Sequence, residues 1–241
     1  MKERLQKFLS RSGLVSRRQG EKLIQAGRVM VNGQVVTTLG LRIDPETDQV
    51  RVDGQPVTHP GQRLTVMLNK PEGYVTTLSD PQGRRQVTDL LVGLNERLYP
   101  VGRLDYDAAG LLLLTNDGEL AHRLMHPRFK VAKTYRLTVA RAMSQAAVQQ
   151  LESGVELGGR TTAPALVRLL KLLPDRTVLE LTVREGRYHQ VKRMCARVGH
   201  PVLKLKRIAY GPLKLGRLPV GAYRELKASE VAQLWKVSGP P

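Results

Sequence analysis

Apolar side chains at the start of the chain recur at helical spacing. Leu5, Phe8 and Leu9 fall at positions i, i+3 and i+4, which places them on one face of a short amphipathic helix. A second helix is predicted to begin after Ser16, because a serine followed three residues later by a glutamine is the signature of a capping box. Gly27 marks its end, since glycine readily adopts the left-handed conformation that follows a helix. Two short helices are therefore expected to open the chain.

A β-hairpin is expected directly after these helices. The dipeptide Asn32-Gly33 supplies two residues that tolerate a positive φ, and valines lie on both sides of it. The helices and the hairpin together predict a compact domain over residues 1–58. His59-Pro60-Gly61 is expected to act as a linker, because proline and glycine interrupt both helices and strands.

The pattern then changes to short apolar runs and alternating positions, which are typical of strands. Such runs occupy residues 63–70, 96–104, 110–115, 133–140, 165–173, 177–184 and 201–209. Helical spacing is found in residues 119–126, 144–152, 188–198 and 229–235. Because these helices do not alternate regularly with the strands, the pattern favours an α+β fold with a mixed, largely antiparallel sheet. We expect residues 63–241 to form this larger domain.

The net charge indicates the kind of partner. The chain has 39 Lys and Arg against 21 Asp and Glu, a formal net charge of +18 over 241 residues. Such an excess favours a polyanion. An acidic membrane is the weaker alternative, because the chain shows no long apolar or amphipathic segment that could enter a bilayer. The N-terminus also lacks the apolar core of a signal peptide, so a cytoplasmic protein is expected.

The positive charge is concentrated near the N-terminus. The first 30 residues hold eight Lys and Arg against two Glu. A charge run is often only a solvated face, but this excess on a few helical turns favours contact with phosphates. The candidate RNA-binding side chains are Arg4, Lys7, Arg11, Arg17, Arg18, Lys22 and Arg28.

The residue types that bind metals form no recognisable motif. The single cysteine, Cys195, can form neither an internal disulfide nor a zinc site. His122 and His126 are four residues apart on a predicted helix, but Arg123 stands where a metalloprotease would need a glutamate. No metal site is therefore expected.

An aspartate stands just before a buried strand in the segment GRLDYDAAGLLLLTNDGEL, which spans residues 102–120. Asp105 precedes the run of leucines that follows Gly110. An aspartate at a turn often does no more than bond neighbouring backbone groups, and for an isolated aspartate that interpretation would be preferred. The surrounding residues favour a catalytic role.

The whole string resembles the signature of the pseudouridine synthases that act on ribosomal RNA. The segments MLNKPEGYVTT, KTYRLTV and REGRYHQVKRMCARVGHPVLKLKRIAYGPL occur in the order that this family shows. Near the start, SRRQGEKLIQAGRVMVNG resembles the S4-type RNA-binding domain. The resemblance covers nearly the entire chain and implies isomerisation of a uridine in ribosomal RNA, with Asp105 as the family's invariant aspartate. It implies no cofactor, because the isomerisation transfers no electrons and consumes no energy donor.

The resemblance also implies roles for four other side chains. A buried carboxylate needs a cation beside it, since burial alone would raise its pKa. Arg187 is the first candidate for this cation and Lys192 is the second. Tyr135 would stack on the base and could help to move the ring proton, and Leu205 would back the pocket.

Arg103, Lys70 and Arg193 complete the set of candidate substrate contacts. In related enzymes an arginine at the position of Arg103 can fill the gap left by a flipped nucleotide, and we expect its side chain on the opposite face from Asp105. Lys70 is expected to support the site or to contact phosphate. Arg193 lies on a polar helical face that would meet the RNA or the active site.

Three function classes follow from these observations: a pseudouridine synthase, a non-catalytic RNA-binding or assembly factor, and an RNA hydrolase that uses Asp105 with water. The GRLD string, the tyrosine and the motif cation together weigh against a binder, and the lack of clustered carboxylates weighs against a metal-dependent hydrolase. A stem-loop of large-subunit ribosomal RNA, free or in an assembly intermediate, is the favoured substrate, because the N-terminal segment and the long catalytic string resemble the large-subunit branch. REGRYHQVKRM resembles the small-subunit branch, which is the alternative. Nothing in the sequence demands more than a monomer.

Overall fold

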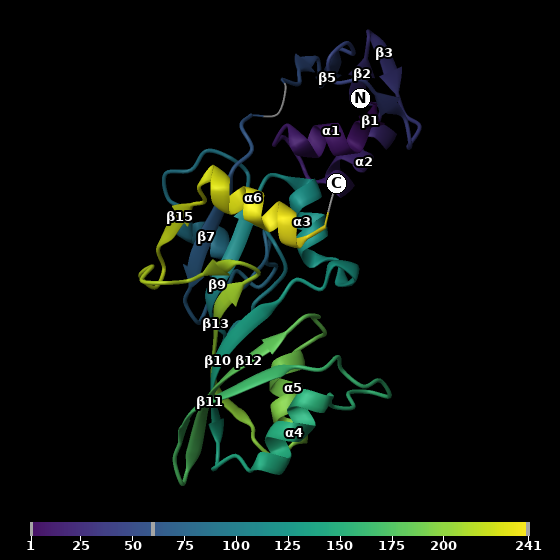
Figure 1. Cartoon of the computed structure of the whole chain (residues 1–241). Coiled ribbons are helices and arrows are strands. Elements are labelled where there is room, and N and C mark those ends of the chain that lie inside the picture. Colours follow the sequence, from purple (N-terminus) through teal and green to yellow (C-terminus); the bar gives the residue numbers. More distant parts are fainter. Residues whose placement is uncertain (1, 59–60, 240–241) are drawn as a thin grey trace. The chain divides into compact units, whose positions relative to one another are not determined.

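The computed structural model describes residues 2–58 and 61–239 (Figure 1). These residues form two compact units that divide near residue 64. The predicted linker residues His59 and Pro60 lie outside the described residues. No helix within the described part is long and apolar enough to cross a membrane.

The two helices predicted at the start of the chain are present as α1 (Leu5–Arg11) and α2 (Arg17–Gln25). The backbone N–H of Gln19 donates to the Ser16 hydroxyl at 3.2 Å, and the Gln19 side chain accepts from the Ser16 N–H at 3.0 Å. The capping box is therefore confirmed, and it satisfies two backbone donors that α2 itself cannot pair.

A small sheet packs with these helices in the N-terminal unit. The predicted hairpin turns at Asn32 and Gly33, whose φ angles are 51° and 80°. Two further strands, which the sequence analysis did not predict, extend it to the order β3-β2-β5-β6. The strands of this unit are β1 (Glu3–Arg4), β2 (Val29–Val31), β3 (Gln34–Val36), β4 (Arg42–Ile43), β5 (Val50–Val52) and β6 (Gln55–Pro56), with β1 paired to β4. Leu5, Phe8 and Leu9 are buried in its core, as their spacing predicted.

The larger unit is built on one sheet of order β11-β12-β10-β13-β9-β7-β15. Its strands are β7 (Thr65–Lys70), β8 (Tyr99–Pro100), β9 (Ala109–Thr115), β10 (Lys133–Ala140), β11 (Leu166–Leu172), β12 (Arg176–Val183), β13 (Val202–Tyr210), β14 (Leu213–Lys214) and β15 (Tyr223–Glu225). Neighbouring strands are antiparallel except for β13 and β9, which are parallel. The mixed, largely antiparallel sheet of an α+β fold is thus confirmed.

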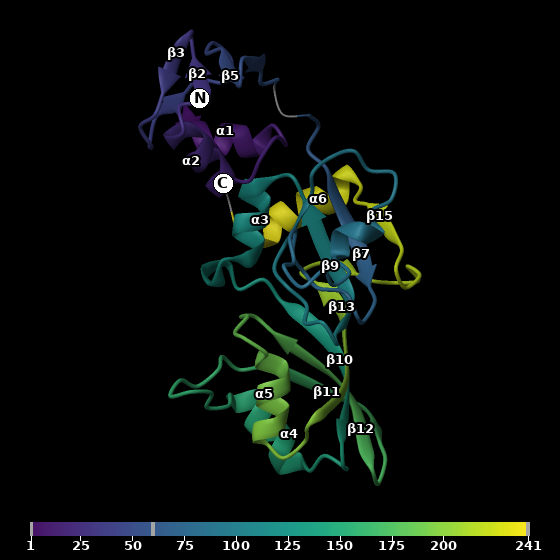
Figure 2. The ribbon, with the colours of Figure 1, turned by 180° about the vertical axis from the view of Figure 1, so that it is seen from behind.

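Helices cover the two halves of this sheet separately (Figures 1 and 2). The half that contains β7, β9 and β15 lies beside α3 (Gly118–Met125) and α6 (Ala228–Val237), whereas the half that contains β10, β11 and β12 lies beside α4 (Gln145–Ser153) and α5 (Gln190–Arg197). Two short 3-10 helices span Val87–Leu90 and Pro127–Phe129.

One predicted strand is much shorter than expected. Residues 96–104 were predicted as a strand, but only Tyr99–Pro100 pairs with β9. Gly102 has a φ of 75°, which turns the chain out of the sheet. The carbonyl of Leu104 instead accepts a hydrogen bond from the Thr76 hydroxyl at 2.7 Å. The prediction failed because the alternation of apolar residues continues through a loop.

The two halves of the sheet meet where β9 lies against β13. Gly110 pairs with Arg207 across this junction and has a φ of 105°. A Cβ atom at position 110 would lie 2.2 Å from the carbonyl oxygen of Arg207, so only glycine allows the strands to approach this closely.

Gly110→Ala should destabilise the protein by more than about 2 kcal/mol, because it adds both a backbone clash and an unfavourable φ. Chemical denaturation of the two proteins would measure the loss. Gly61→Ala is a matched control, since Gly61 has open space around its Cβ position, and it should change stability by less than about 0.5 kcal/mol. Equal stabilities for Gly110→Ala and the unmodified protein would contradict the importance of this contact.

Candidate active site

Asp105 lies in the loop between β8 and β9, and a buried lysine fixes the backbone of that loop. The Lys70 ammonium donates to the carbonyls of Pro71, Asp105 and Ala108 at 2.9, 3.0 and 2.7 Å. Lys70 is fully buried at the end of β7 and is absent from the pocket lining. The structure contradicts a phosphate contact for Lys70, whereas a supporting role agrees with these contacts.

Burial makes the Lys70 side chain harder to protonate. Loss of solvent lowers the pKa of Lys70 to about 8, and the nearby charges of Asp105 and Asp107 oppose that shift. A protonated lysine carries three N–H donors, which matches the three carbonyls closest to it.

Two side chains from the start of α5 approach the Asp105 carboxylate. The Lys192 ammonium lies 3.6 Å from one carboxylate oxygen, and the His189 Nε2 atom lies 3.3 Å from the other. Lys192 also binds Asp107 at 2.5 Å, and this hydrogen bond lowers the pKa of Asp107. The carboxylate of Asp105 is only partly exposed, so these contacts act with reduced screening by water.

Lys192, the second candidate, is therefore the cation that the structure places beside Asp105. The first candidate, Arg187, is directed elsewhere: its guanidinium donates to the carbonyls of Arg160 and Thr161 at 2.9 and 2.8 Å and pairs with Glu185. These bonds hold the loop that precedes α5, so the preference for Arg187 as the partner of Asp105 was wrong.

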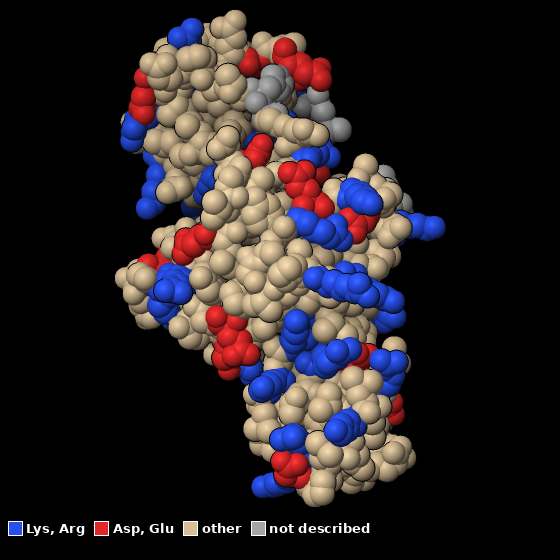
Figure 3. Space-filling view, turned by 90° about the vertical axis from the view of Figure 1, so that its left-hand side faces the viewer, with Lys and Arg blue, Asp and Glu red and all other residues tan. Residues whose placement is uncertain are grey.

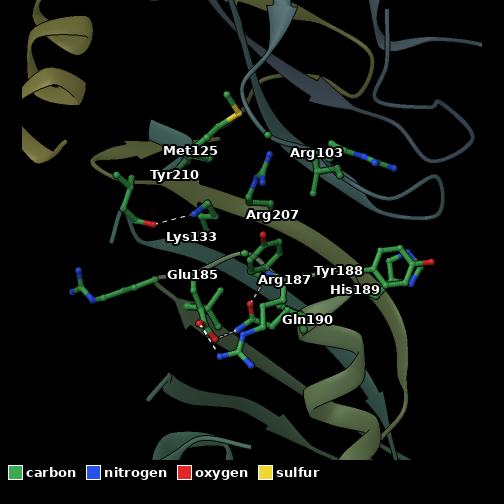
Figure 4. A pocket seen from close by; sticks show the side chains of 18 of the residues that line it. Arg103, Met125, Lys133, Glu185, Arg187, Tyr188, His189, Gln190, Arg207 and Tyr210 are labelled. Carbon is green, nitrogen blue, oxygen red and sulfur yellow. Dashed lines mark hydrogen bonds and ion pairs between the residues drawn. The ribbon is translucent and has the colours of Figure 1, made fainter. Parts of the chain in front are cut away.

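A cavity of about 460 Å³ opens beside Asp105 (Figure 4). Its lining comes from both halves of the sheet and includes Tyr135 on β10 and Leu205 on β13. Both side chains are more than nine-tenths buried. The cavity is large enough for a nucleoside, and it presents one carboxylate next to an aromatic and an aliphatic wall.

The structure corrects the expectation for Arg103 and narrows the one for Arg193. Arg103 lines the same cavity as Asp105, whereas an opposite face was expected. Residues two apart in an extended segment point to the same side, which is why Arg103 and Asp105 can face one cavity. Arg193 is exposed on α5 and does not line the cavity, so contact with RNA outside the cavity stays the prediction for it.

Among the cavity residues that the sequence analysis did not propose are His189, Lys133 and Arg207. His189 adopts a φ of 48° at the N-terminus of α5, a backbone conformation that carries no sequence signal at a histidine. Lys133 and Arg207 had a detectable signal. Arg207 lies two residues after Leu205 on the buried face of its strand, and a cation at such a position is unusual. Burial and the charge of Arg207 together lower the pKa of Lys133 to about 8.

Basic residues continue outside the cavity. On the open face of the larger sheet, Arg136 and Arg168 share the carboxylate of Glu180, and the exposed Lys204 and the partly exposed Lys206 lie on neighbouring β13. Figure 3 shows many Lys and Arg side chains on the visible face of the larger unit.

The predicted RNA-binding cations of the N-terminal unit fall into two groups. Lys7 and Arg11 lie 3.7 and 3.3 Å from Glu3, and Arg28 is paired with Asp53. The other four are exposed and form no ion pair within the described residues; they are Arg4, Arg17, Arg18 and Lys22. These four are the most accessible to an external anion.

A model of the RNA pseudouridylate synthase family matches residues 64–197, and a model of the S4 domain matches residues 3–48. The chain belongs to the RNA pseudouridylate synthase family and carries an N-terminal S4 domain, which confirms the resemblance found in the sequence. It is thus an isomerase that acts on RNA.

Relatives and a solved structure match over almost the whole chain. An uncharacterised RNA pseudouridine synthase of Aquifex aeolicus is 48% identical over 240 residues, which cover 99% of this chain and 96% of the relative. Ribosomal large subunit pseudouridine synthase B of Bacillus subtilis is 44% identical over 234 residues, which cover 96% and 95%. A crystal structure of a pseudouridylate synthase has a TM-score of 0.70 and 34% identity, and the match covers 96% of this chain and 99% of the other.

Lys70→Met should lower the stability of the protein and the rate of pseudouridine formation, because three loop carbonyls lose their common donor. A loss of about 2–4 kcal/mol in the free energy of unfolding is expected at roughly 1 kcal/mol for each bond. Denaturation and single-turnover assays would measure both effects. Lys236→Met, at an exposed position of α6, is the control and should change neither. Unchanged stability and turnover in Lys70→Met would show that the loop does not depend on Lys70.

Proposed function

We propose that this enzyme isomerises a uridine in a stem-loop of large-subunit ribosomal RNA and that Asp105 is its nucleophile. The observation that carries the proposal is the position of the Asp105 carboxylate, which lies at a base-sized cavity and is contacted by Lys192 and His189. A carboxylate that contacts a cation beside a cavity of this size suits attack on the ribose of an extruded nucleotide.

The proposed reaction needs only groups of the chain and the RNA. The Asp105 carboxylate forms a bond to ribose C1′ while the bond from C1′ to uracil N1 breaks, and the electron pair of that bond stays on the uracil. The uracil then turns in the cavity, and its C5 atom attacks C1′ and releases the carboxylate. C5 loses its proton and N1 gains one, so atoms and electrons balance.

Four residues of the cavity lining have proposed roles in this scheme besides Asp105. The Lys192 ammonium lies 3.6 Å from the Asp105 carboxylate and helps to hold it in position. Tyr135 stacks on the uracil and is the candidate to assist the proton transfer, while Leu205 closes the pocket behind the base. Arg103, at the same cavity, fills the space that the uridine leaves in the RNA.

We further propose that residues 1–58 bind RNA and that residues 63–241 form the catalytic domain. The four unpaired cations, Arg4, Arg17, Arg18 and Lys22, support this role for the N-terminal part. The name of the Bacillus subtilis relative supports large-subunit RNA as the substrate over the small-subunit alternative. We propose that a monomer is active, and this substrate would place the enzyme in the cytoplasm.

Asp105→Asn should abolish pseudouridine formation and leave RNA affinity within about twofold, because it removes the nucleophile with little change of shape. The assay incubates each protein separately with protein-free large- and small-subunit ribosomal RNA and maps pseudouridine in both. Asp175→Asn, at an exposed position outside the cavity lining, is the matched control and should retain turnover. Turnover by Asp105→Asn would exclude Asp105 as the nucleophile, and product only in small-subunit RNA would refute the proposed substrate.

Replacing Arg18 and Lys22 with glutamine should weaken RNA binding and reduce its dependence on salt. These side chains lie one helical turn apart on α2, and each lost phosphate contact lowers the slope of log K against log salt by nearly one unit. Filter binding at several salt concentrations would measure it. Replacement of Lys227, the N-cap residue of α6, and of Lys236 on α6 by glutamine is the charge-matched control. A slope equal to that of the unmodified enzyme would show that this face of α2 does not touch the RNA.

A further inference from the structure

Arg207 is a buried cation with unused hydrogen-bond donors. Its side chain is 2% exposed, and its Nε atom donates to the carbonyl of Leu111 at 2.6 Å. The Nη2 atom is buried without an acceptor, and within the described residues no carboxylate lies close enough to form an ion pair. Removing a guanidinium from water without a counter-ion costs free energy, so other interactions must compensate for this desolvation.

Aromatic rings compensate this charge only in part. The guanidinium carbon lies 5.2 Å from the ring centre of Tyr210 and 6.0 Å from that of Tyr135. Such contacts stabilise a positive charge but leave the N–H groups without an oxygen acceptor. Arg207 also lowers the pKa of the neighbouring Lys133 and Lys70, so positive charge is in excess around the cavity.

The cavity is the place where a ligand could complete these contacts. Arg207 lines it together with Leu205 on β13, and the strand register sets Arg207 beside Tyr135 (Figure 4). Arginine can only donate hydrogen bonds, so the matching ligand atom is an oxygen with partial or full negative charge. A uridine nucleotide offers such oxygens on its phosphates and on its two ring carbonyls.

The position of Arg207 favours the ring carbonyls. The phosphates of an extruded nucleotide must stay continuous with the RNA chain, and the base is the part that enters deepest. A side chain with 2% exposure next to the proposed stacking tyrosine lies at the depth of the base.

We propose that Arg207 donates to a carbonyl oxygen of the target uracil and holds the ring both before and after it turns. The proposal rests on the function proposed above. A half-turn of uracil about the axis through N3 and C6 exchanges N1 with C5 and also exchanges O2 with O4. A fixed donor on one side of the ring therefore meets a carbonyl oxygen in both orientations.

This contact would also stabilise the detached base. When the bond from N1 to C1′ breaks, the electron pair left on the ring is shared with O2 and O4, and a preorganised cation lowers the energy of that charge. Cytosine carries an amino group in place of one carbonyl, so in one orientation it would set a donor against the Arg207 donor. The same guanidinium thus provides both stabilisation and selection for uracil.

The test uses a fragment of the mapped ribosomal RNA that carries uridine, 2-thiouridine or 4-thiouridine at the target position. Sulfur accepts hydrogen bonds more weakly than oxygen, so each thio substitution should slow single turnover by the unmodified enzyme by roughly 10-fold with little change in RNA affinity. Arg207→Gln should slow turnover of uridine by roughly 100-fold and reduce each thio effect to about 2-fold or less. Lys133→Gln, which removes another cation of the same cavity, should keep the thio effects of the unmodified enzyme.

Equal rates of the unmodified enzyme on all three RNAs would overturn the proposal, and this result does not depend on whether an Arg207 variant folds. Full thio effects in Arg207→Gln would also overturn it. So would a rate loss confined to RNA with a methylphosphonate beside the target, which would assign Arg207 to the backbone. None of these outcomes affects the assignment of Asp105, which fails only if Asp105→Asn retains turnover.

Discussion

The close approach of β9 and β13 at Gly110 determines the geometry of the whole catalytic unit. The two halves of the sheet are joined by this short parallel pairing, and each half carries part of the cavity. The loop with Asp105 leads directly into β9, while Arg207 belongs to the opposing strand. A larger residue at position 110 would separate the strands and with them the two walls of the site.

Two buried cations donate hydrogen bonds to backbone carbonyls next to the site. Lys70 holds the Asp105 loop through three carbonyls, and Arg207 is held by the carbonyl of Leu111 in β9. Both use uncharged backbone oxygens as partners. Arg207 pairs with no carboxylate within the described residues, whereas the charges of Asp105 and Asp107 act on Lys70.

Much of the architecture could be predicted from the sequence, because caps and tight turns depend on interactions between residues that are close in the chain. The capping box at Ser16 and the hairpin turn at Asn32-Gly33 depend only on neighbouring residues, and the structure confirms both. The short strand at Tyr99–Pro100 could not be predicted, because Gly102 ends an apolar alternation that continues in the sequence.

The sequence predicted several residues that line the site, but it did not predict which of them contact one another. Asp105, Tyr135 and Leu205 do line one cavity, but sequence could not decide which cation lies beside the carboxylate. That choice depends on the turn at His189, whose positive φ starts α5 so that Lys192 reaches Asp105 and Arg187 does not. Such a turn is set by tertiary packing, which local patterns do not record.

The position of Lys192 between two carboxylates has a consequence for the course of the reaction. Its ammonium is closer to Asp107 than to Asp105, at 2.5 Å against 3.6 Å. When Asp105 is esterified in the proposed reaction it loses its charge, yet Lys192 still has an anion beside it. The proposed covalent intermediate therefore leaves no cation without an anionic partner. Asp107 would hold the Lys192 ammonium in place until the Asp105 carboxylate is released.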